Sequence, residues 1–242
     1  MIIALNEGKR IVLPLVIHTK MPSAFKKLYR LLLDALFPCR CAGCDKLGNY
    51  LCLDCELSLC PAREHLGDDT IAIFDYRDPK IRQLLWLLKY RGVRDIGAFF
   101  GHLLYDNSAE WLADELALYP RSGQTLVLPA PLSRERFRQR GYNQSALIAK
   151  NFAERDSKNF RFAPKLLLKK KNTRSQVELK DRQARLDNLH GAFAVADKKK
   201  IRGKIIILID DVTTTGTTLA ECAHVLKSAG ARRVISLAVA HG

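Results

Sequence analysis

The residues with the clearest chemical potential follow a run of five apolar residues, Ile205–Ile209. Two adjacent carboxylates, Asp210 and Asp211, come first, and a small, hydroxyl-rich segment with one glycine comes next. Paired acids suit sugar hydroxyls directly or Mg²⁺ through water, whereas hydroxyls and backbone N–H groups beside a helix N-terminus suit a phosphate. The candidate phosphate ligands are Thr214, Thr215, Gly216, Thr217 and Thr218. An anion site beside a diol site describes a ribose 5-phosphate.

The pattern around these residues predicts a buried parallel strand, a loop at its carboxyl end and a helix. Ile205–Ile209 is apolar throughout, and a helical apolar period runs from Leu219 to Ala229 and stops at Gly230. Ligands of open α/β sheets bind at the carboxyl ends of strands, so the loop lies where a phosphate is expected. The glycine patterns of P-loops and of dinucleotide-binding folds are absent. A threonine-rich turn without a ligand is the alternative, but a turn does not call for paired aspartates.

Alternating strands and helices in the remainder predict a mostly parallel sheet flanked by helices over residues 70–242. Asp78 followed by Pro79 is typical of a helix start, and Lys169 to Arg185 is polar and basic, as expected for a mobile loop. The other expected strands are Thr70–Tyr76, Thr125–Pro129, Phe160–Leu168, Ala192–Ala196 and Arg233–Ala240. The other expected helices are Phe25–Leu36, Asp95–Leu118 and Gln144–Arg155.

Six of the seven cysteines fall between residues 39 and 60. Two Cys-x-x-Cys pairs stand seven residues apart, and they consist of Cys41, Cys44, Cys52 and Cys55. Four thiolates at this spacing favour a closed tetrahedral site for structural Zn²⁺, whose binding would supply most of the folding free energy of so short a segment. Disulfides are the alternative, which the lack of a secretory signal disfavours. Either spare cysteine, Cys39 or Cys60, could replace a ligand.

The length and charge of the chain limit its domain organisation and the kind of partner it can bind. At 242 residues and 48% hydrophobic composition, it can form one sizeable α/β domain with a small accessory module. The formal charge is +15, and the excess is clustered at Arg134, Arg136, Arg138 and Arg140, at Lys169–Lys171 and at Lys198–Lys200. Such a surface favours polyanions, either pyrophosphate-bearing metabolites or nucleic acid. For Lys198–Lys200 a solvated face without a partner is the favoured interpretation.

Nothing in the sequence predicts a membrane segment, and we expect a cytoplasmic protein. No apolar run is long enough to cross a bilayer, and Ile11–Ile17 contains Pro14 and lacks a cleavage site for a secretory signal. Residues 1–36 are expected to form an extension and a helix. Residues 1–20 could be dispensable, with Met21 as the true start.

Motifs along most of the chain, taken together and in order, resemble those of the ComF/GntX family over residues 37–239. The Asp210–Thr218 segment is similar to the phosphoribosyl-pyrophosphate (PRPP) loop of the type I phosphoribosyltransferases. The other matching elements are Phe37-Pro38 with the cysteine pairs, Leu88-Lys89-Tyr90-Arg91-Gly92, Pro129-x-Pro131, Arg140-Gly141-Tyr142-Asn143-Gln144, Ser175-Gln176 with Arg182 and Arg185, and Gly191-Ala192-Phe193. Tyr142 stands where the family pattern has phenylalanine. The resemblance implies a type I phosphoribosyltransferase-like fold preceded by a four-cysteine zinc module over residues 37–62.

The resemblance also implies a reaction, in which a nucleophile attacks C1 of the ribose as Mg-pyrophosphate departs. The candidate catalytic residues are Asp210, Asp211, Arg140 and Lys89. Further contacts to the ligand are expected from Pro131, Arg134, Arg136, Arg182 and Arg185. The first three belong to a second loop that would bring backbone amides and cations to the pyrophosphate, and the last two to a basic segment that would close over the site.

The acceptor and catalysis itself are left open. Purine-base transferases carry an aspartate two positions before the loop glycine, where this chain has Thr214, which disfavours purine salvage. The family implies a link to uptake of transforming DNA, or to gluconate metabolism. Three functions therefore compete: a Mg²⁺-dependent transferase using PRPP, a non-catalytic phosphosugar or nucleotide sensor, and an interaction protein that contacts single-stranded DNA or a DNA-uptake helicase. Aromatic residues among the basic ones are sparse, at Phe137 and Tyr142, which weakens direct DNA recognition.

Overall fold

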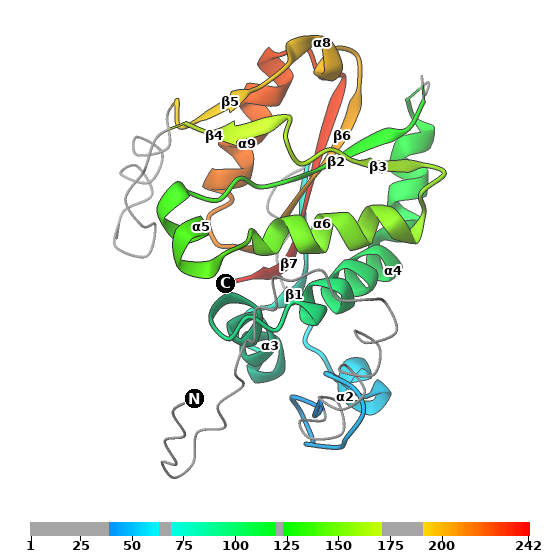
Figure 1. Ribbon diagram of the computed structural model, residues 1–242. Helices are drawn as coiled ribbons and strands as arrows, with labels where there is room; N and C mark the ends of the chain where they lie inside the picture. Colours follow the sequence, from blue (N-terminus) through cyan, green and yellow to red (C-terminus); the bar gives the residue numbers. More distant parts are fainter. Residues whose placement is uncertain (1–38, 63–68, 120–122, 171–190) are drawn as a thin grey trace, which may run out of the picture.

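The core of the protein is a five-stranded sheet in which every pair of neighbours is parallel. A computed structural model describes residues 39–62, 69–119, 123–170 and 191–242. The strands are β1 (Thr70–Asp75), β2 (Thr125–Pro129), β3 (Phe160–Phe162), β6 (Ile205–Thr213) and β7 (Arg233–His241), in the spatial order β1-β7-β6-β2-β3 (Figure 1). The expected parallel sheet flanked by helices is confirmed.

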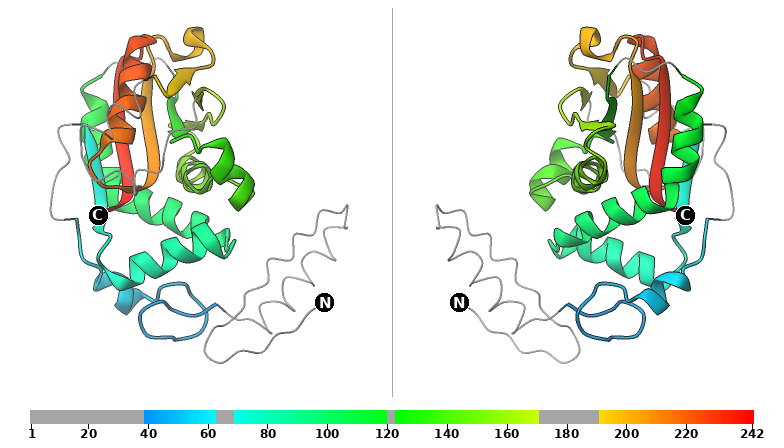
Figure 2. Two further views of the ribbon diagram at one scale, coloured as in Figure 1. Left: turned by 90° about the vertical axis from the view of Figure 1, so that its left-hand side faces the viewer. Right: turned by 90° about the vertical axis from the view of Figure 1, so that its right-hand side faces the viewer.

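Helices cover both faces of this sheet (Figure 2). On one face lie α4 (Asp95–Ala117) and α6 (Gln144–Arg155), with α3 (Pro79–Tyr90) packed beside α4. On the other lies α9 (Thr217–Ser228), together with an antiparallel pair of short strands, β4 (Leu167–Lys169) and β5 (Phe193–Val195). Three shorter helices complete the described elements, α2 (Leu53–Leu57), α5 (Arg134–Arg140) and α8 (Lys198–Ile201). None of the described helices is long and apolar enough to cross a membrane.

Strand β6 shows why its sequence is apolar at every position. Ile205, Ile207 and Ile209 pack into the cluster formed by α3, α4 and α6, whereas the two residues between them pack against α9 and the β4–β5 pair. Side chains alternate along a strand, so a sheet covered on both faces needs an apolar residue at each step. The strand runs on to Thr213, which places both aspartates within the strand, near its carboxyl end, rather than in the loop that follows it.

Helix α6 approaches α4 closely because α4 carries glycine at two contact positions. A Cβ on Gly97 would lie 2.6 Å from Cβ of Leu147, and one on Gly101 would lie 2.7 Å from the Ile148 carbonyl oxygen. These distances are far below van der Waals contact, so no larger residue fits without moving a helix. The packing fixes α6, whose N-terminus lies beside the carboxyl end of β6.

Two predictions of local structure are wrong, and both have a physical reason. The single strand expected over Phe160–Leu168 is divided between β3, in the main sheet, and β4, in the small one. Pro164 lies between them and has no N–H for a sheet hydrogen bond. The second loop is in part the helix α5, which Ser133 caps by accepting from the Arg136 N–H and which Gly141 ends at a φ of 74°.

Other predictions are confirmed closely or fall outside the described residues. The Asp78 carboxylate caps α3 by accepting from the Lys80 N–H, with Pro79 in the first turn, as its sequence predicts. The expected helix over Phe25–Leu36, the N-terminal extension and the two arginines Arg182 and Arg185 lie outside the residues that the structure describes.

Candidate functional site

The sheet has its topological switch point between β2 and β6. From β2 the chain moves outward to β3, whereas from β6 it moves the opposite way to β7. Crevices at such points, outside the carboxyl ends of the strands, are where open α/β sheets bind ligands. A cavity of about 1290 Å³ lies here, and residues that follow β2, residues that end β6 and one face of α3 line it.

The two aspartates line this cavity and face different partners. Asp211 is buried, at 4% exposed, and its Oδ2 forms an ion pair of 2.8 Å with Nζ of Lys89 at the end of α3. Oδ1 of Asp210 accepts hydrogen bonds of 2.8 Å from the Ser145 hydroxyl and from the Asp211 N–H. Lys89 and the acid pair, which are far apart in sequence, therefore meet at one point.

The surroundings of the two carboxyls shift their pKa values in opposite directions. Burial, followed by the charge of Asp211, raises the pKa of Asp210 to about 7. Burial acts on Asp211 in the same direction, but the Lys89 ammonium, helped by Arg140, outweighs it and lowers the pKa of Asp211 below its usual value. Asp211 is therefore the more acidic carboxyl of the pair, and Asp210 holds its proton to a higher pH.

The hydroxyl-rich segment connects β6 to α9 at the same edge. Thr214 and Thr218 line the cavity, whereas the other three candidates, Thr215, Gly216 and Thr217, do not. Hydroxyl oxygens of Thr215 and Thr217 lie 2.6 Å apart, so these two partner each other. Gly216 has a φ of 71° and precedes the first turn of α9, whose N–H groups have no intrahelical acceptor.

The end of β7 contacts this segment through two hydrogen bonds. Nε2 of His241 lies 2.8 Å from the Thr214 carbonyl oxygen, and the N–H of Gly242 donates to the Thr213 carbonyl oxygen at 3.0 Å. His241 is not among the residues predicted from the sequence. Its signal would have been a polar residue at the end of a strand that neighbours β6.

The four alternating arginines of α5 lie on two different faces of the helix. Arg136 and Arg140, four residues apart and on one face of the helix, line the cavity together with Pro131. Arg134 and Arg138, on the other face, are exposed and do not line it. Across the cavity Lys169 ends β4, and burial together with the charge of Arg136 lowers its pKa. Clustered cations of this kind are stabilised by a bound anion.

The Arg140–Gln144 segment joins this wall to α3 and α6. Asn143 caps α6 by accepting from the Ser145 N–H, and its Nδ2 donates to the Ala130 carbonyl oxygen at 2.9 Å. The hydroxyl of Tyr142 donates to the Leu88 carbonyl oxygen, next to Lys89. That bond requires the hydroxyl group, which gives a structural reason for tyrosine at the position where the family pattern has phenylalanine.

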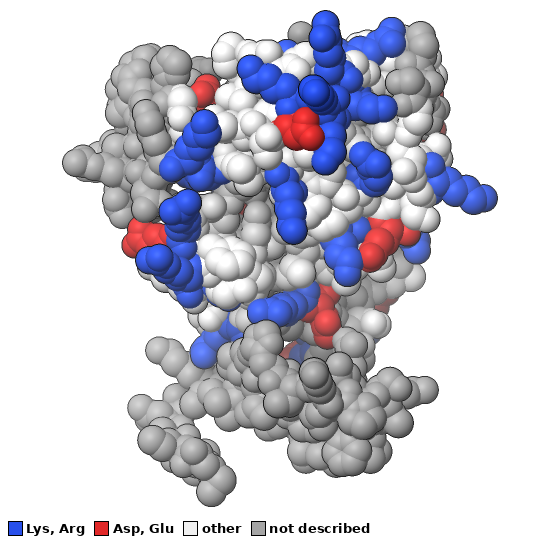
Figure 3. Space-filling model, turned by 45° about the horizontal axis from the view of Figure 1, so that its top comes forward, with Lys and Arg blue, Asp and Glu red and all other residues white. Residues whose placement is uncertain are grey.

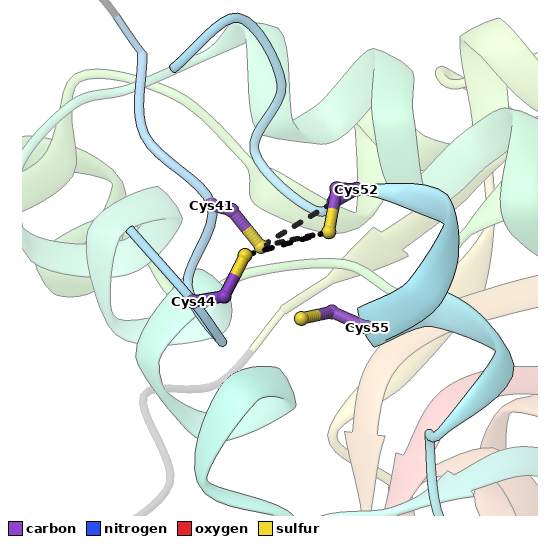
Figure 4. A group of neighbouring side chains, drawn as sticks. All are labelled: Cys41, Cys44, Cys52 and Cys55. Atoms are coloured by element: carbon purple, nitrogen blue, oxygen red, sulfur yellow. Dashed lines mark hydrogen bonds between the residues drawn. The ribbon is translucent and has the colours of Figure 1, made fainter. Parts of the chain in front are cut away.

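The four cysteines of the two Cys-x-x-Cys pairs converge at the other end of α3 (Figure 4). Their Sγ atoms all lie within 4.8 Å of one another, with separations of 3.5 Å for Cys44–Cys52 and 3.7 Å for Cys41–Cys52. These are too long for disulfide bonds, but a tetrahedral ion bound at about 2.3 Å would set the sulfurs about 3.8 Å apart. Neither Cys39 nor Cys60 belongs to the group. The cluster therefore fits a structural metal ion.

Backbone groups and a glycine support the cysteine cluster. The N–H groups of Gly43 and Cys52 each point at Sγ of Cys41 from 3.4 Å. A Cβ on Gly43 would lie 2.6 Å from Sγ of Cys55, so glycine is needed there. Such N–H···S contacts stabilise thiolate ligands of metal ions.

The cysteine segment is fixed to the start of α3. Nζ of Lys80 donates to the carbonyl oxygen of Ser58 at 3.0 Å, and the Cys60 N–H donates to Oδ2 of Asp78 at 3.2 Å. The residues after it pair antiparallel with β1, through a bridge between Pro61 and Phe74. One helix thus contacts the cysteine segment at its first turn and supplies Lys89 to the cavity at its last.

Comparison with known proteins identifies the chain. Residues 157–242 match the phosphoribosyl transferase domain family. Competence protein F of Haemophilus influenzae is 27% identical over 207 residues, 80% of this chain and 86% of that protein. Competence protein ComFC of Streptococcus pneumoniae is 30% identical over 209 residues, which cover 81% of this chain and 84% of that protein. The chain belongs to the ComF family.

Among solved structures, a phosphoribosylpyrophosphate synthetase from Mycobacterium smegmatis is similar at 18% identity and a TM-score of 0.30, over 55% of this chain and 33% of that one. The ComF resemblance drawn from the motifs is confirmed by the relatives of this chain.

The cavity also contains residues that sequence reasoning about the ComF motifs missed. These are Ser145, Gln144, Trp86 and Tyr90, besides a few polar residues of α3 and α5. Gln144 ends the Arg140–Gln144 motif and Ser145 follows it directly. Their place at the end of that motif was the available signal. Tyr90 belongs to the Leu88–Gly92 motif, which was its signal, whereas Trp86 had none, because an exposed aromatic residue in an amphipathic helix carries no mark of what it faces.

Lysine and arginine side chains gather on the face that Figure 3 brings forward, with few acidic side chains among them. Lys198–Lys200, which form most of α8, are exposed, and Asp197 caps this helix by accepting from the Lys199 N–H. They do not line the cavity. The solvated face without a partner, which the sequence favours for this run, stays a prediction.

Proposed function

We propose that the cavity of this ComF protein binds PRPP, or another ribose 5-phosphate, together with Mg²⁺, as the donor site of a phosphoribosyltransferase. The observation that carries the proposal is the junction at the β2–β6 switch point, where the acid pair, Thr214 and Thr218, and two arginines share one cavity. Each group suits a different part of one ligand.

The assignment of these groups follows from their chemistry. The turn at Thr214–Thr218 and the first N–H groups of α9 would bind the 5-phosphate, and Asp210 would accept from the ribose hydroxyls. Lys89 keeps Asp211 ionised beside them. Arg136 and Arg140 would bind the pyrophosphate, whose departure leaves several negative charges. Asp210 and Asp211 would hold hydrated Mg²⁺, which would neutralise part of that charge when bound with the donor.

Titration calorimetry with PRPP and MgCl₂ tests the donor site. We expect binding in the micromolar range that is lost in Asp210→Asn/Asp211→Asn and kept in Asp114→Asn, an exposed acid of α4 outside the cavity. A wild-type protein that binds no PRPP, or a double variant that binds it equally well, would rule the proposal out.

The alternative is a sensor that binds the donor without turnover. Thr214, where purine-base transferases have an aspartate, favours it, since threonine is no base near neutral pH. Pyrophosphate release measured across a panel of bases and amines separates the two. Turnover with any acceptor, abolished in the double variant, would exclude the sensor.

The names of the relatives suggest where the protein acts. Because they are competence proteins, we propose a role for this chain in DNA uptake, on the cytoplasmic side, with a DNA-uptake helicase or single-stranded DNA as partner. The exposed basic face supports contact with a polyanion (Figure 3). Phosphate contacts predict affinity for an oligonucleotide that falls steeply with salt, so salt-independent binding would count against the role.

We further propose that the ion in the cysteine cluster is Zn²⁺. Four thiolates in a closed tetrahedral arrangement are typical of structural zinc. Metal analysis of the purified protein tests this, with one zinc per chain expected and any other metal in that amount contradicting it.

A further inference from the structure

We propose that His241, at the carboxyl end of β7, is a positioning residue for phosphate binding. Its imidazole fixes the peptide group between Thr214 and Thr215, so that the Thr215 N–H stays available to the phosphate. The inference rests on the proposed function, because the phosphate concerned is the 5-phosphate of the donor. It assigns a task to a side chain that does not itself line the cavity.

The first observation is that the backbone of His241 is held on both sides. Strand β7 lies between β1 and β6, and His241 pairs with Asp75 in one and with Thr213 in the other. Its carbonyl oxygen accepts from the Tyr76 N–H at 2.7 Å, and the N–H of Gly242, the next residue, donates to the Thr213 carbonyl oxygen at 3.0 Å. A side chain on a strand held in this way can position a neighbouring loop precisely.

The second observation is the contact between this side chain and the turn. Nε2 of the half-buried ring lies 2.8 Å from the Thr214 carbonyl oxygen. A carbonyl oxygen only accepts, so the ring nitrogen carries the hydrogen and donates it. The described chain has no cis peptide bond, and in a trans peptide group the C=O and the following N–H point in opposite directions. Because His241 binds the oxygen, the Thr215 N–H points away from the ring.

The third observation is that the turn has unused donors. The backbone N–H groups of Thr214, Thr215 and Gly216 donate to no other described residue. Successive open N–H groups directly before a helix such as α9 form a site for an anion. The hydroxyls of Thr215 and Thr217 partner each other, which leaves the backbone of this part of the turn as its donor to a phosphate. Orienting one of these N–H groups therefore acts on the phosphate without any contact between it and His241.

Substitution of His241 tests the role. His241→Met has a similar reach but no donor, so the ligand itself must order the peptide group. Ordering the backbone of one residue lowers affinity by about 5- to 30-fold, and we expect that loss for ribose 5-phosphate and for PRPP, each measured by calorimetry with MgCl₂. His241→Gln, whose side-chain NH₂ donates from a similar position, should restore most of the affinity. His224→Met, at an exposed position of α9 outside the cavity, should match the wild type.

Pyrophosphate supplies a readout that a merely structural role would not move. Its proposed ligands are Arg136 and Arg140, which belong to α5 and not to the turn. Pyrophosphate with MgCl₂ should therefore bind His241→Met as tightly as it binds the wild type. An equal loss for pyrophosphate and ribose 5-phosphate would mean that the whole site is disturbed, which overturns the proposal. A His241→Gln protein that binds ribose 5-phosphate no better than His241→Met would overturn it too.

The position of the hydrogen on the ring is a second readout, and it needs no ligand. Nitrogen–proton correlation spectra of the histidine rings show which ring nitrogen carries hydrogen, and the signal that is missing from His241→Gln identifies His241. We expect hydrogen on Nε2 in the ligand-free protein. Hydrogen on Nδ1 alone would overturn the proposal, because Nε2 could not then donate to Thr214.

Three outcomes of the binding experiments separate this role from the donor site. If PRPP binds the wild type and His241→Met equally well, the positioning role fails while the donor site stands. If no PRPP binds but inorganic phosphate does, and His241→Met weakens this, the donor site fails while His241 still positions a phosphate-binding turn. If the wild type binds neither PRPP nor inorganic phosphate, both proposals fail.

Discussion

The substitution Asp210→Asn should stabilise the ligand-free protein and do so more strongly as the pH rises. Its Oδ1 already accepts from the Ser145 hydroxyl and the Asp211 N–H, and an asparagine oxygen can accept both bonds. What the variant loses is a charge that burial and the neighbouring Asp211 disfavour. Residues placed for a ligand often lower the stability of the empty protein in this way.

The magnitude follows from the raised pKa of Asp210. In the folded protein this carboxyl holds its proton up to about pH 7, whereas an unperturbed one releases it near 3.8. Folding therefore takes up a proton between these values, and wild-type stability falls as the pH rises through that window. At about 1.36 kcal/mol per pKa unit, the full cost is at most about 4 kcal/mol. The lowered pKa of Asp211 acts below pH 3.8 and leaves this window untouched.

Thermal unfolding of both proteins at several pH values, in buffer without Mg²⁺ and without chelator, measures the effect. Between about pH 5 and pH 8 we expect the advantage of Asp210→Asn to widen by about 2 kcal/mol, or roughly 4 to 8 °C for a chain of this length. Asp114→Asn controls for the loss of an acid outside the cavity. An advantage that is constant with pH, or that shrinks as the solution becomes more alkaline, would refute the reasoning.

Three other substitutions probe separate parts of the structure. Lys89→Met leaves Asp211 buried without its cation and should cost about 3 kcal/mol in denaturant unfolding, while Lys89→Arg should cost less; equal losses would argue against the ion pair. Gly101→Ala places a Cβ 2.7 Å from atoms of α6 and should cost about 1–3 kcal/mol in the same assay, and a neutral result would mean that the two helices separate freely. Cys55→Ser should lower the zinc content well below one per chain, and it should weaken PRPP binding because the cysteine segment contacts the start of α3. The control Cys60→Ser should keep both the zinc and the PRPP binding. An unchanged zinc content in Cys55→Ser would exclude Cys55 as a ligand.

The strand, acids and hydroxyl-rich turn at β6 could be predicted because each leaves a local mark in the sequence. A short unbroken run rich in β-branched isoleucine is typical of a strand buried on both faces, and paired aspartates directly after it have no packing purpose. The start of α3 could also be predicted, because Asp78 accepts a hydrogen bond from a free N–H of the first turn and Pro79 lacks an N–H that would need an acceptor there.

What sequence reasoning missed depends on contacts between distant segments. The alternating arginines of α5 suggest an exposed loop rather than a helix. Only the period of the observed helix shows which of these arginines lie on the same face. The split of Phe160–Leu168 reflects a change of sheet at Pro164, which apolar content does not reveal. Trp86 and Gln144 become interesting only once α3 and α6 are seen to face the same cavity.

A crystal structure of the protein with PRPP and Mg²⁺ would test the central claim most directly. The account predicts that the 5-phosphate lies against the turn of Thr214–Thr218 and that the ribose hydroxyls lie within hydrogen-bond distance of Asp210. The pyrophosphate should face Arg136 and Arg140. A ligand bound elsewhere, or one whose ribose leaves the acid pair untouched, would contradict it.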